Sequence, residues 1–320
     1  MLNMKFKSFI LNIRNSFLFT PVIALIFMII ILSLLSTHFL TISNAINVLR
    51  QISIISIVAV GMTYTILTGG IDLSVGSVVA LSGVITAILL KNYGVNMYLA
   101  MVIGIFAGVI CGSITGSLIT SKIKMPPFIA GLVIMSIMRG VALVITDGRP
   151  IFNLPKQFEF LGNKSLIGVP ILVFIMIIVY IIAYINLNYT KMGMSLYATG
   201  GNENAARLAG INTNRIKLSA YMISGLTAGI AGVCLASRVM VGEPIAGYNY
   251  ELDAIAASVI GGADFIGGTA NIWGTLTGSL IIGLLRNGLN LLNISTYYQQ
   301  IAIGLVVTLT ISFNLLKKTK

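Results

Sequence analysis

Long apolar runs separated by short polar stretches are the feature that most constrains how this chain folds. A helix needs about 20 predominantly apolar residues to cross a bilayer, and the 320-residue chain offers about ten apolar segments on that scale. We expect them near residues 17–36, 50–68, 74–90, 97–119, 128–146, 167–186, 218–236, 252–262, 272–292 and 297–316. Only 9% of the residues are charged, against roughly 25% in an ordinary soluble domain. The sequence therefore predicts an all-α fold, a polytopic transmembrane helix bundle.

Two of the apolar segments are unlike the others. The segment 252–262 is too short to span a bilayer unaided, and irregular backbone at membrane depth is tolerated only inside protein or beside water. We predict a partial or re-entrant helix there. The run 17–36 follows basic residues, as a signal peptide does, but no small-residue cleavage site follows it. We expect this run to be retained as the first helix.

Basic residues fall unevenly on the two sides of the predicted bundle. With the N-terminus inside, the cytoplasmic segments hold twelve of them: Lys5, Lys7, Arg14, Lys122, Lys124, Lys191, Arg207, Arg215, Lys217, Lys317, Lys318 and Lys320. The outer segments hold six: Arg50, Lys91, Arg149, Lys156, Lys164 and Arg238. Because cytoplasmic loops carry the excess of Lys and Arg, we predict both termini in the cytoplasm and an even number of crossings. The chain then divides into a cytoplasmic segment 1–16, one transmembrane domain 17–316 with a cytoplasmic loop 187–217, and a cytoplasmic tail 317–320.

The composition also argues against several classes of function. The net charge is +12, yet the basic residues form no stripe with interleaved aromatic residues of the kind that binds nucleic acid. His38 has no acidic or thiol partner nearby in the sequence to complete a metal site. Cys111 and Cys234 both lie inside apolar runs. We predict no catalytic residues, no metal site, no disulfide and no nucleic-acid partner.

A carboxylate set among glycines lies between the second and third predicted spans. The segment contains Gly69, Gly70, Asp72, Ser74 and Gly76. A charge at the centre of a spanning helix costs roughly 2.5–3.5 kcal/mol on insertion scales, so such a residue usually faces protein or a water-filled cavity. Two roles fit Asp72. It can cap the N-terminus of the third span, where free amides and the helix dipole favour a negative charge, or it can take part in gating.

A second segment, 261–268, shares the pattern Gly-Gly-x-Asp-apolar-x-x-Gly with residues 69–76. Each segment stands just before a long apolar span. On the predicted topology both segments face the same side of the membrane, as in a parallel duplication.

Small and polar residues mark particular helix faces. Glycines recur every four residues in the fourth span and twice in the seventh, at Gly104, Gly108, Gly112, Gly116, Gly225 and Gly229. Such stripes let helix backbones approach closely, so we expect helix packing there and not a substrate path.

The second and ninth spans carry polar side chains at Ser53, Ser56, Thr63, Asn287 and Asn290. Lining a path and bonding neighbouring helices together are both consistent with these side chains.

The loop 187–217 contains a short predicted helix. Asn202 is a typical N-cap residue, Glu203 complements the helix dipole in the first turn, and Gly210 can end the helix. One interpretation is a docking helix for another protein. The other is a helix resting on lipid headgroups, which Arg207 and Arg215 would favour.

Several segments, taken in order, resemble one family of membrane proteins. They are IDLSVG (71–76), GGNE (200–203), YELDAIAA (250–257), NGLNLL (287–292) and YYQ (297–299). Together they resemble the membrane permease of bacterial ribose-type importers, within the ribose, xylose, arabinose and galactoside class of ATP-binding-cassette (ABC) transporters. The resemblance covers essentially the whole chain.

The resemblance implies a multi-pass protein of the bacterial cytoplasmic membrane that works with partners. Two permease copies would form the sugar path, and two cytoplasmic ATPase domains would bind ATP and Mg and drive transport. An extracytoplasmic binding protein would deliver the sugar. The chain has no Gly-x-x-x-x-Gly-Lys-Ser/Thr phosphate loop, so we expect no cofactor on this chain.

The resemblance also implies roles for particular residues. In importer permeases the loop that meets the ATPase carries an Ala-Ala-x-x-x-Gly core, and the usual preceding Glu is displaced here by one position. The expected coupling helix comprises Asn202, Glu203, Ala205, Ala206, Arg207 and Gly210. Docking of the binding protein is expected on the outer loops, with the candidates Arg238, Glu243, Glu251 and Asp253. The alternative function is an ion-coupled secondary transporter that uses Asp72 as its relay.

Overall fold

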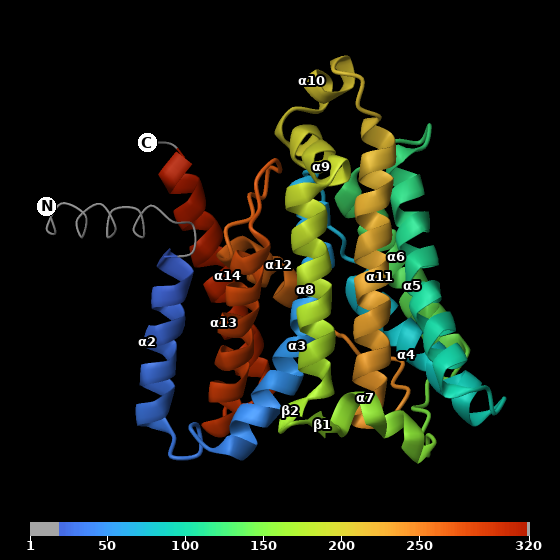
Figure 1. The fold of residues 1–320 in the computed structure, drawn as a ribbon, viewed down its shortest axis with the longest axis vertical. Helices are drawn as coiled ribbons and strands as arrows, with labels where there is room; N and C mark the ends of the chain where they lie inside the picture. The colour runs from blue at the N-terminus through green and yellow to red at the C-terminus, as the bar shows by residue number, and fades with distance from the viewer. Residues whose placement is uncertain (1–18, 319–320) are drawn as a thin grey trace, which may run out of the picture.

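The computed structural model describes residues 19–318 and shows a bundle of roughly aligned helices (Figure 1). The predicted segment 1–16 and the last two residues of the predicted tail lie outside the described residues. The helices that correspond to the ten predicted segments are α2 (Phe19–Leu35), α3 (Ile42–Leu67), α4 (Val75–Lys91), α5 (Met97–Thr120), α6 (Pro127–Val144), α8 (Ile171–Tyr189), α11 (Thr213–Val239), α12 (Tyr250–Ile260), α13 (Ile272–Leu291) and α14 (Thr296–Lys318). The predicted helical membrane bundle is confirmed.

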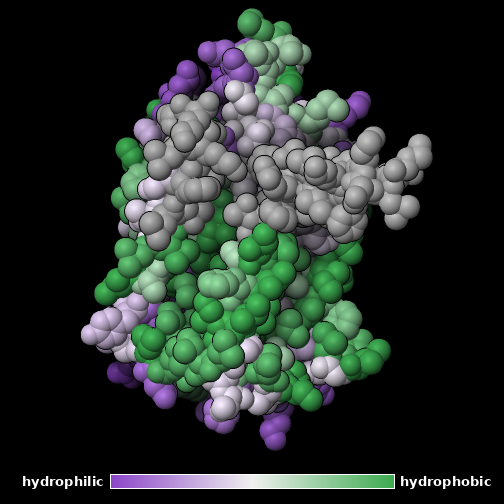
Figure 2. Space-filling model, turned by 90° about the vertical axis from the view of Figure 1, so that its left-hand side faces the viewer, coloured by the Kyte–Doolittle hydropathy of each residue, from purple (hydrophilic) through white to green (hydrophobic). Residues whose placement is uncertain are grey.

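The apolar character of these helices agrees with that class. By length and composition α3, α5, α6, α8 and α11 can each cross a bilayer. On the visible lower half of the face that carries α2, hydrophobic residues predominate, and hydrophilic residues lie near the lower edge (Figure 2). Large apolar side chains of α2 such as Phe27 and Leu34 are exposed there, as expected of a surface that meets lipid tails.

Short elements close the two ends of the bundle. One end carries α9 (Lys191–Gly201) and α10 (Glu203–Leu208), and the other carries the 3-10 helix η1 (Lys156–Phe158), α7 (Glu159–Asn163) and an antiparallel pair, β1 (Ser165–Leu166) and β2 (Val169–Pro170) (Figure 1). We call them the α10 end and the α7 end. The first described residues of α2 and the last of α14 both lie toward the α10 end (Figure 1). This arrangement fits an even number of crossings, while the assignment of the α10 end to the cytoplasm stays a prediction.

Helix α3 is the centre of the bundle. Every residue from 52 to 67 is buried, because α8, α11, α12 and α13 pack around it. The helix begins at Ile42, before the predicted start at 50, because Thr41 caps it: the Thr41 hydroxyl accepts a hydrogen bond from the Asn44 amide at 3.3 Å. Its first turns therefore extend beyond the apolar run.

The glycine stripes bring α5 and α11 into backbone contact. A Cβ placed on Gly225 would lie 2.2 Å from the Gly108 carbonyl oxygen, and one placed on Gly112 would lie 2.2 Å from the Tyr221 carbonyl oxygen. Neither position has room for any other residue. The predicted packing role of these glycines is confirmed.

Helix α12 is joined to re-entrant backbone that passes the start of α4. After α11, Gly242 pairs with Ile151 near the α7 end, and by Gly247 the chain has reached the start of α4 beside Gly76. Arg139 of α6 holds this segment by donating to the Pro244 and Ala246 carbonyls, each at 2.8 Å. Helix α12, with 11 residues, then runs toward the α10 end. It is the partial helix that the sequence predicted.

Candidate functional site

Asp72 is buried where the chain turns from α3 into α4, with 1% of its surface exposed. Its Oδ1 accepts hydrogen bonds from the Ser74 amide at 3.0 Å and the Ser74 hydroxyl at 2.6 Å. Its Oδ2 accepts one from the Ser224 hydroxyl of α11 at 2.7 Å. Ser74 is the N-cap residue of α4 and makes no side-chain capping hydrogen bond. Asp72 therefore bonds to the cap residue and not to an amide of the first helical turn, and its capping role stays a prediction. Ser224 lies 152 residues away in sequence and was not among the predicted site residues.

The glycines around Asp72 stand where other backbone or side chains come close. Gly69 has a φ of +75°, a conformation that favours glycine. A Cβ on Gly70 would lie 2.4 Å from the Tyr221 hydroxyl, which donates to the Ile71 carbonyl at 3.3 Å. A Cβ on Gly76 would clash with Glu251 of α12. The segment is therefore fitted closely between α11 and α12.

The second glycine-aspartate segment lies directly against the first. The Gly268 amide donates to the Leu67 carbonyl at 2.9 Å, and a Cβ on Gly267 would lie 2.8 Å from the Gly69 nitrogen. Both segments thus lie on one side of the bundle, as predicted. Asp264 accepts from the amide two residues ahead at 3.1 Å, as Asp72 does, but only Asp72 is fully buried.

The predicted short helix in the loop 187–217 is present as α10 at the tip of its end (Figure 1). Asn202 caps it by accepting from the Ala205 amide at 3.0 Å, and Gly210 follows it with a φ of +84°. Ala206 is buried, whereas Ala205 and Arg207 are exposed. The helix therefore projects from the bundle and presents one side to the surroundings.

Glu203 fastens α10 to the start of α11. Its carboxylate pairs with Lys217 at 2.5 Å and with Arg207 at 3.0 Å, and it accepts from the Thr213 hydroxyl at 3.2 Å. The hydrogen bond from Lys217 lowers the pKa of Glu203 below its usual value. Lys217 and Thr213 were not predicted as site residues. Glu203 stands one position before the usual Glu of the importer loop motif, and from there its carboxylate reaches α11.

The candidate path residues of α3 are fully buried in this chain. Ser53 donates to the Leu49 carbonyl at 2.7 Å. The Thr63 hydroxyl lies 3.1 Å from that of Ser258 and 2.8 Å from that of Thr275, joining α3 to α12 and α13. The Ser56 hydroxyl has no hydrogen-bond partner among the described residues. Of these side chains only Thr63 joins helices in this conformation, and a role in lining a path stays a prediction.

The candidate path residues of α13 make contacts near the α7 end. Asn287 and Asn44 of α3 exchange two side-chain hydrogen bonds, at 2.8 and 3.1 Å. Asn290 accepts from Gln299 of α14 at 2.7 Å. Both asparagines therefore join neighbouring helices.

One of the expected docking residues is not at the surface. Asp253 has no exposed surface and pairs with Arg286 of α13 at 2.8 Å, because the re-entrant segment carries the start of α12 into the bundle. Asp253 is therefore not available for docking in this structure. Arg238, Glu243 and Glu251 are partly exposed, and their docking role stays a prediction.

Arg139 and Arg286 are site residues that the sequence reasoning left without a role. A buried charge in a membrane helix needs a partner. The need for a partner could have suggested the Arg286 pair, because Asp253 lies in the neighbouring predicted segment. The carbonyl partners of Arg139 leave no trace in the sequence.

A helical bundle with several membrane-spanning helices, a partial helix at a re-entrant segment and a projecting loop helix defines a polytopic membrane protein. The family model described as "Branched-chain amino acid transport system / permease component" matches residues 44–311. The chain belongs to this permease family, and it is a multi-pass membrane protein.

Curated relatives cover nearly the whole chain. It is 46% identical over 293 residues to the ribose import permease protein of Bacillus subtilis, across 91% of this chain and 90% of that protein. It is 44% identical over 294 residues to the ribose import permease protein of Haemophilus influenzae, across 90% of each chain. It is 38% identical over 281 residues to the L-arabinose transport system permease protein of Escherichia coli, across 88% of this chain and 85% of that protein. No solved structure matches the chain.

Proposed function

We propose that this chain is the permease subunit of a bacterial ABC importer for ribose. The observation that carries the proposal is the order of the identities: 46% and 44% to two ribose import permeases, against 38% to the L-arabinose permease. The matched shares of the chain are nearly equal. The difference in identity therefore does not come from differences in length.

We infer that α10 is the contact for a separate ATPase subunit. The helix projects from its end of the bundle (Figure 1), and Leu208 at its last turn is 91% exposed, offering an apolar contact to a partner. ATP and Mg would bind to that subunit, and this chain would bind no cofactor. Two copies of the chain would form the path. An extracytoplasmic binding protein would deliver ribose at the α7 end, near Arg238, Glu243 and Glu251.

Movement of α10 would reach the membrane interior through α11. Glu203 joins α10 to Lys217 at the start of α11, and Ser224, further along α11, joins it to Asp72. Asp72 in turn holds the start of α4 through Ser74. Closure of the ATPase subunits would therefore displace α10, α11 and the start of α4 together.

The proposal is tested by reconstitution in proteoliposomes with radiolabelled ribose. Uptake is measured with and without the ATPase, the binding protein and ATP. Uptake that requires all three supports the proposal. Uptake by this chain alone, driven by an imposed ion gradient, would overturn it in favour of a secondary transporter with Asp72 as the coupling site.

The docking role of α10 is tested by replacing Arg207 and Gly210 together with alanine. Ribose uptake by the full importer should fall strongly, because Gly210 ends the helix with a positive φ and Arg207 lies on its exposed side. Lys122→Ala, in another loop at the α10 end, is the matched control. Unchanged uptake by a stably expressed double variant would rule out this docking role.

A further inference from the structure

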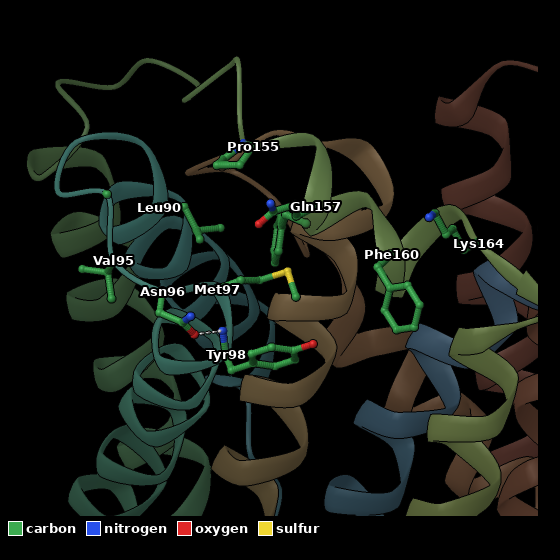
Figure 3. A pocket seen from close by; sticks show the side chains of 11 residues that line it. Leu90, Val95, Asn96, Met97, Tyr98, Pro155, Gln157, Phe160 and Lys164 are labelled. Carbon is green, nitrogen blue, oxygen red and sulfur yellow. Dashed lines mark hydrogen bonds between the residues drawn. The ribbon is translucent and has the colours of Figure 1, made fainter.

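A cavity of about 520 Å³ lies at the α7 end, between the turn that joins α4 to α5 and the η1–α7 segment (Figure 3). Leu90, Met97 and the fully buried Phe158 give it an apolar interior. Asn96 and Gln157 add amide groups. Its volume is in the range of small-molecule sites. None of the roles described above uses this cavity.

The charges around the cavity are mainly positive. Lys164 is the one charged side chain among the described residues that line it. Its ammonium group lies 6.0 Å from the centre of the Phe160 ring. The two chain segments that form the cavity, 90–98 and 155–164, contain three lysines and one glutamate. The cavity therefore favours a ligand with a negative charge.

An exposed apolar strip leads away from the cavity along α5. Tyr98 lines the cavity, and Val102 and Phe106 follow at intervals of four residues, so the three side chains share one helix face. They are 66%, 61% and 60% exposed. On a membrane-spanning helix such a face meets lipid tails. A ligand held in the cavity can therefore extend an apolar chain along α5.

We propose that this cavity binds an anionic phospholipid from the leaflet at the α7 end. Lys164 pairs with the phosphate group, and the amides of Asn96 and Gln157 bond to headgroup oxygens. One acyl chain lies on the strip of Tyr98, Val102 and Phe106. A docking protein would satisfy the lysine but would leave the membrane-facing strip without a role, so the strip favours a lipid. The inference does not depend on which sugar is transported.

The experiment uses tryptophan fluorescence, because the chain has a single tryptophan, Trp273. This residue lies in the first turn of α13, toward the α10 end. A Trp273→Phe, Tyr98→Trp variant places the one tryptophan at the cavity. The protein is reconstituted in phosphatidylcholine vesicles that contain either brominated phosphatidylglycerol or brominated phosphatidylcholine, and quenching is compared.

We expect brominated phosphatidylglycerol to quench the tryptophan at position 98 more strongly than brominated phosphatidylcholine does. The apparent affinity of the cavity should be about fivefold higher for phosphatidylglycerol. This factor corresponds to the contribution of about one lysine near an anionic lipid. Adding Lys164→Gln should remove the preference, whereas Lys122→Gln, at the opposite end, should leave it intact. The unaltered chain, with its tryptophan at position 273, reports the general effect of anionic lipid on the protein.

Three results would overturn the proposal. They are equal quenching by the two lipids, a preference that survives Lys164→Gln, and a preference abolished by inorganic phosphate, which would indicate a free-anion site. Should Tyr98→Trp fail to fold, native mass spectrometry of the unaltered chain and its Lys164→Gln variant gives the same decision. Phosphatidylglycerol should remain bound to the first and be lost from the second, and equal retention would contradict the proposal.

Discussion

Two buried carboxylates stand at the starts of helices α4 and α12, and they are stabilised in different ways. Asp72 accepts hydrogen bonds from one amide and two hydroxyls, all neutral donors. Asp253 is paired with the guanidinium of Arg286. The comparison teaches that neutral donors are enough to satisfy one buried carboxyl group where the chain breaks inside the bundle. The other site holds two charged groups that depend on each other. The same substitution should therefore have different costs at the two positions.

The largest effect is expected at the ion pair. Asp253→Asn leaves Arg286, whose side chain is 20% exposed, without a counter-charge. Breaking a buried pair costs about 3–5 kcal/mol, and the loss here should lie near the lower end of that range. Denaturant unfolding of the purified protein in detergent measures the loss. Combining Asp253→Asn with Arg286→Gln should recover part of it, because the orphaned charge is removed. A loss below about 1 kcal/mol for Asp253→Asn would show that the pair is not a significant contact.

Removing a neutral donor should have a smaller effect. Ser224→Ala takes away the only described donor to Asp72 Oδ2, and an unsatisfied buried acceptor costs about 1–3 kcal/mol. Ser224→Thr keeps the hydroxyl and is the matched control. The same unfolding measurement applies, and a stability loss that is equal for Ala and Thr would indicate a packing effect and not a hydrogen bond.

Features set by local sequence could be predicted, whereas the surroundings of the two carboxylates could not. The long helices follow from their apolar runs, and residues 202–210 carry their own capping signals, so both were predictable from local sequence. The surroundings of Asp253 were not, because hydropathy does not show that residues 240–249 turn back into the bundle. The contact of Asp72 with Ser224 was also hidden, since it joins segments 152 residues apart.

The short elements at the α7 end were missed for a similar reason. Helix α7 has only five residues and is held by tertiary contacts. The Gly162 amide donates to the Ser237 hydroxyl at 2.9 Å, and Asn163 donates to the Arg238 carbonyl at 3.0 Å. A helix of this length has no stability of its own. Its sequence therefore carries no readable signal.

A smaller loss of stability is expected from Asp72→Asn. The asparagine carbonyl can still accept from Ser74, and the Ser224 hydroxyl can turn to accept from the amide group. The cost should then be about 1 kcal/mol, that of one rearranged hydrogen bond. Unfolding of this variant beside Asp253→Asn tests the comparison directly, and equal losses at the two sites would break it.

The smallest effect is expected at Glu203, whose side chain is 34% exposed. Solvent screens such pairs, so Glu203→Gln should cost about 0–1 kcal/mol at pH 7. The folded-state pKa is lowered from the usual 4.5. The carboxylate therefore stabilises the fold above pH 4.5, and this contribution is lost as the pH falls through the lowered value. Unfolding measured across that range should show the wild type and the variant converging in acid, and a constant difference would contradict the assignment.

The central claim is that Asp72 ties α4 to α11 and carries no transported proton or cation. Ribose uptake by proteoliposomes that contain the Asp72→Asn variant, the ATPase, the binding protein and ATP tests it most directly. We predict that uptake stays within about fivefold of the wild type, since one rearranged hydrogen bond is worth about 1 kcal/mol, and that a protonophore does not change it. Abolished uptake by a variant that folds as stably as the wild type would contradict the claim and identify Asp72 as a coupling carboxylate.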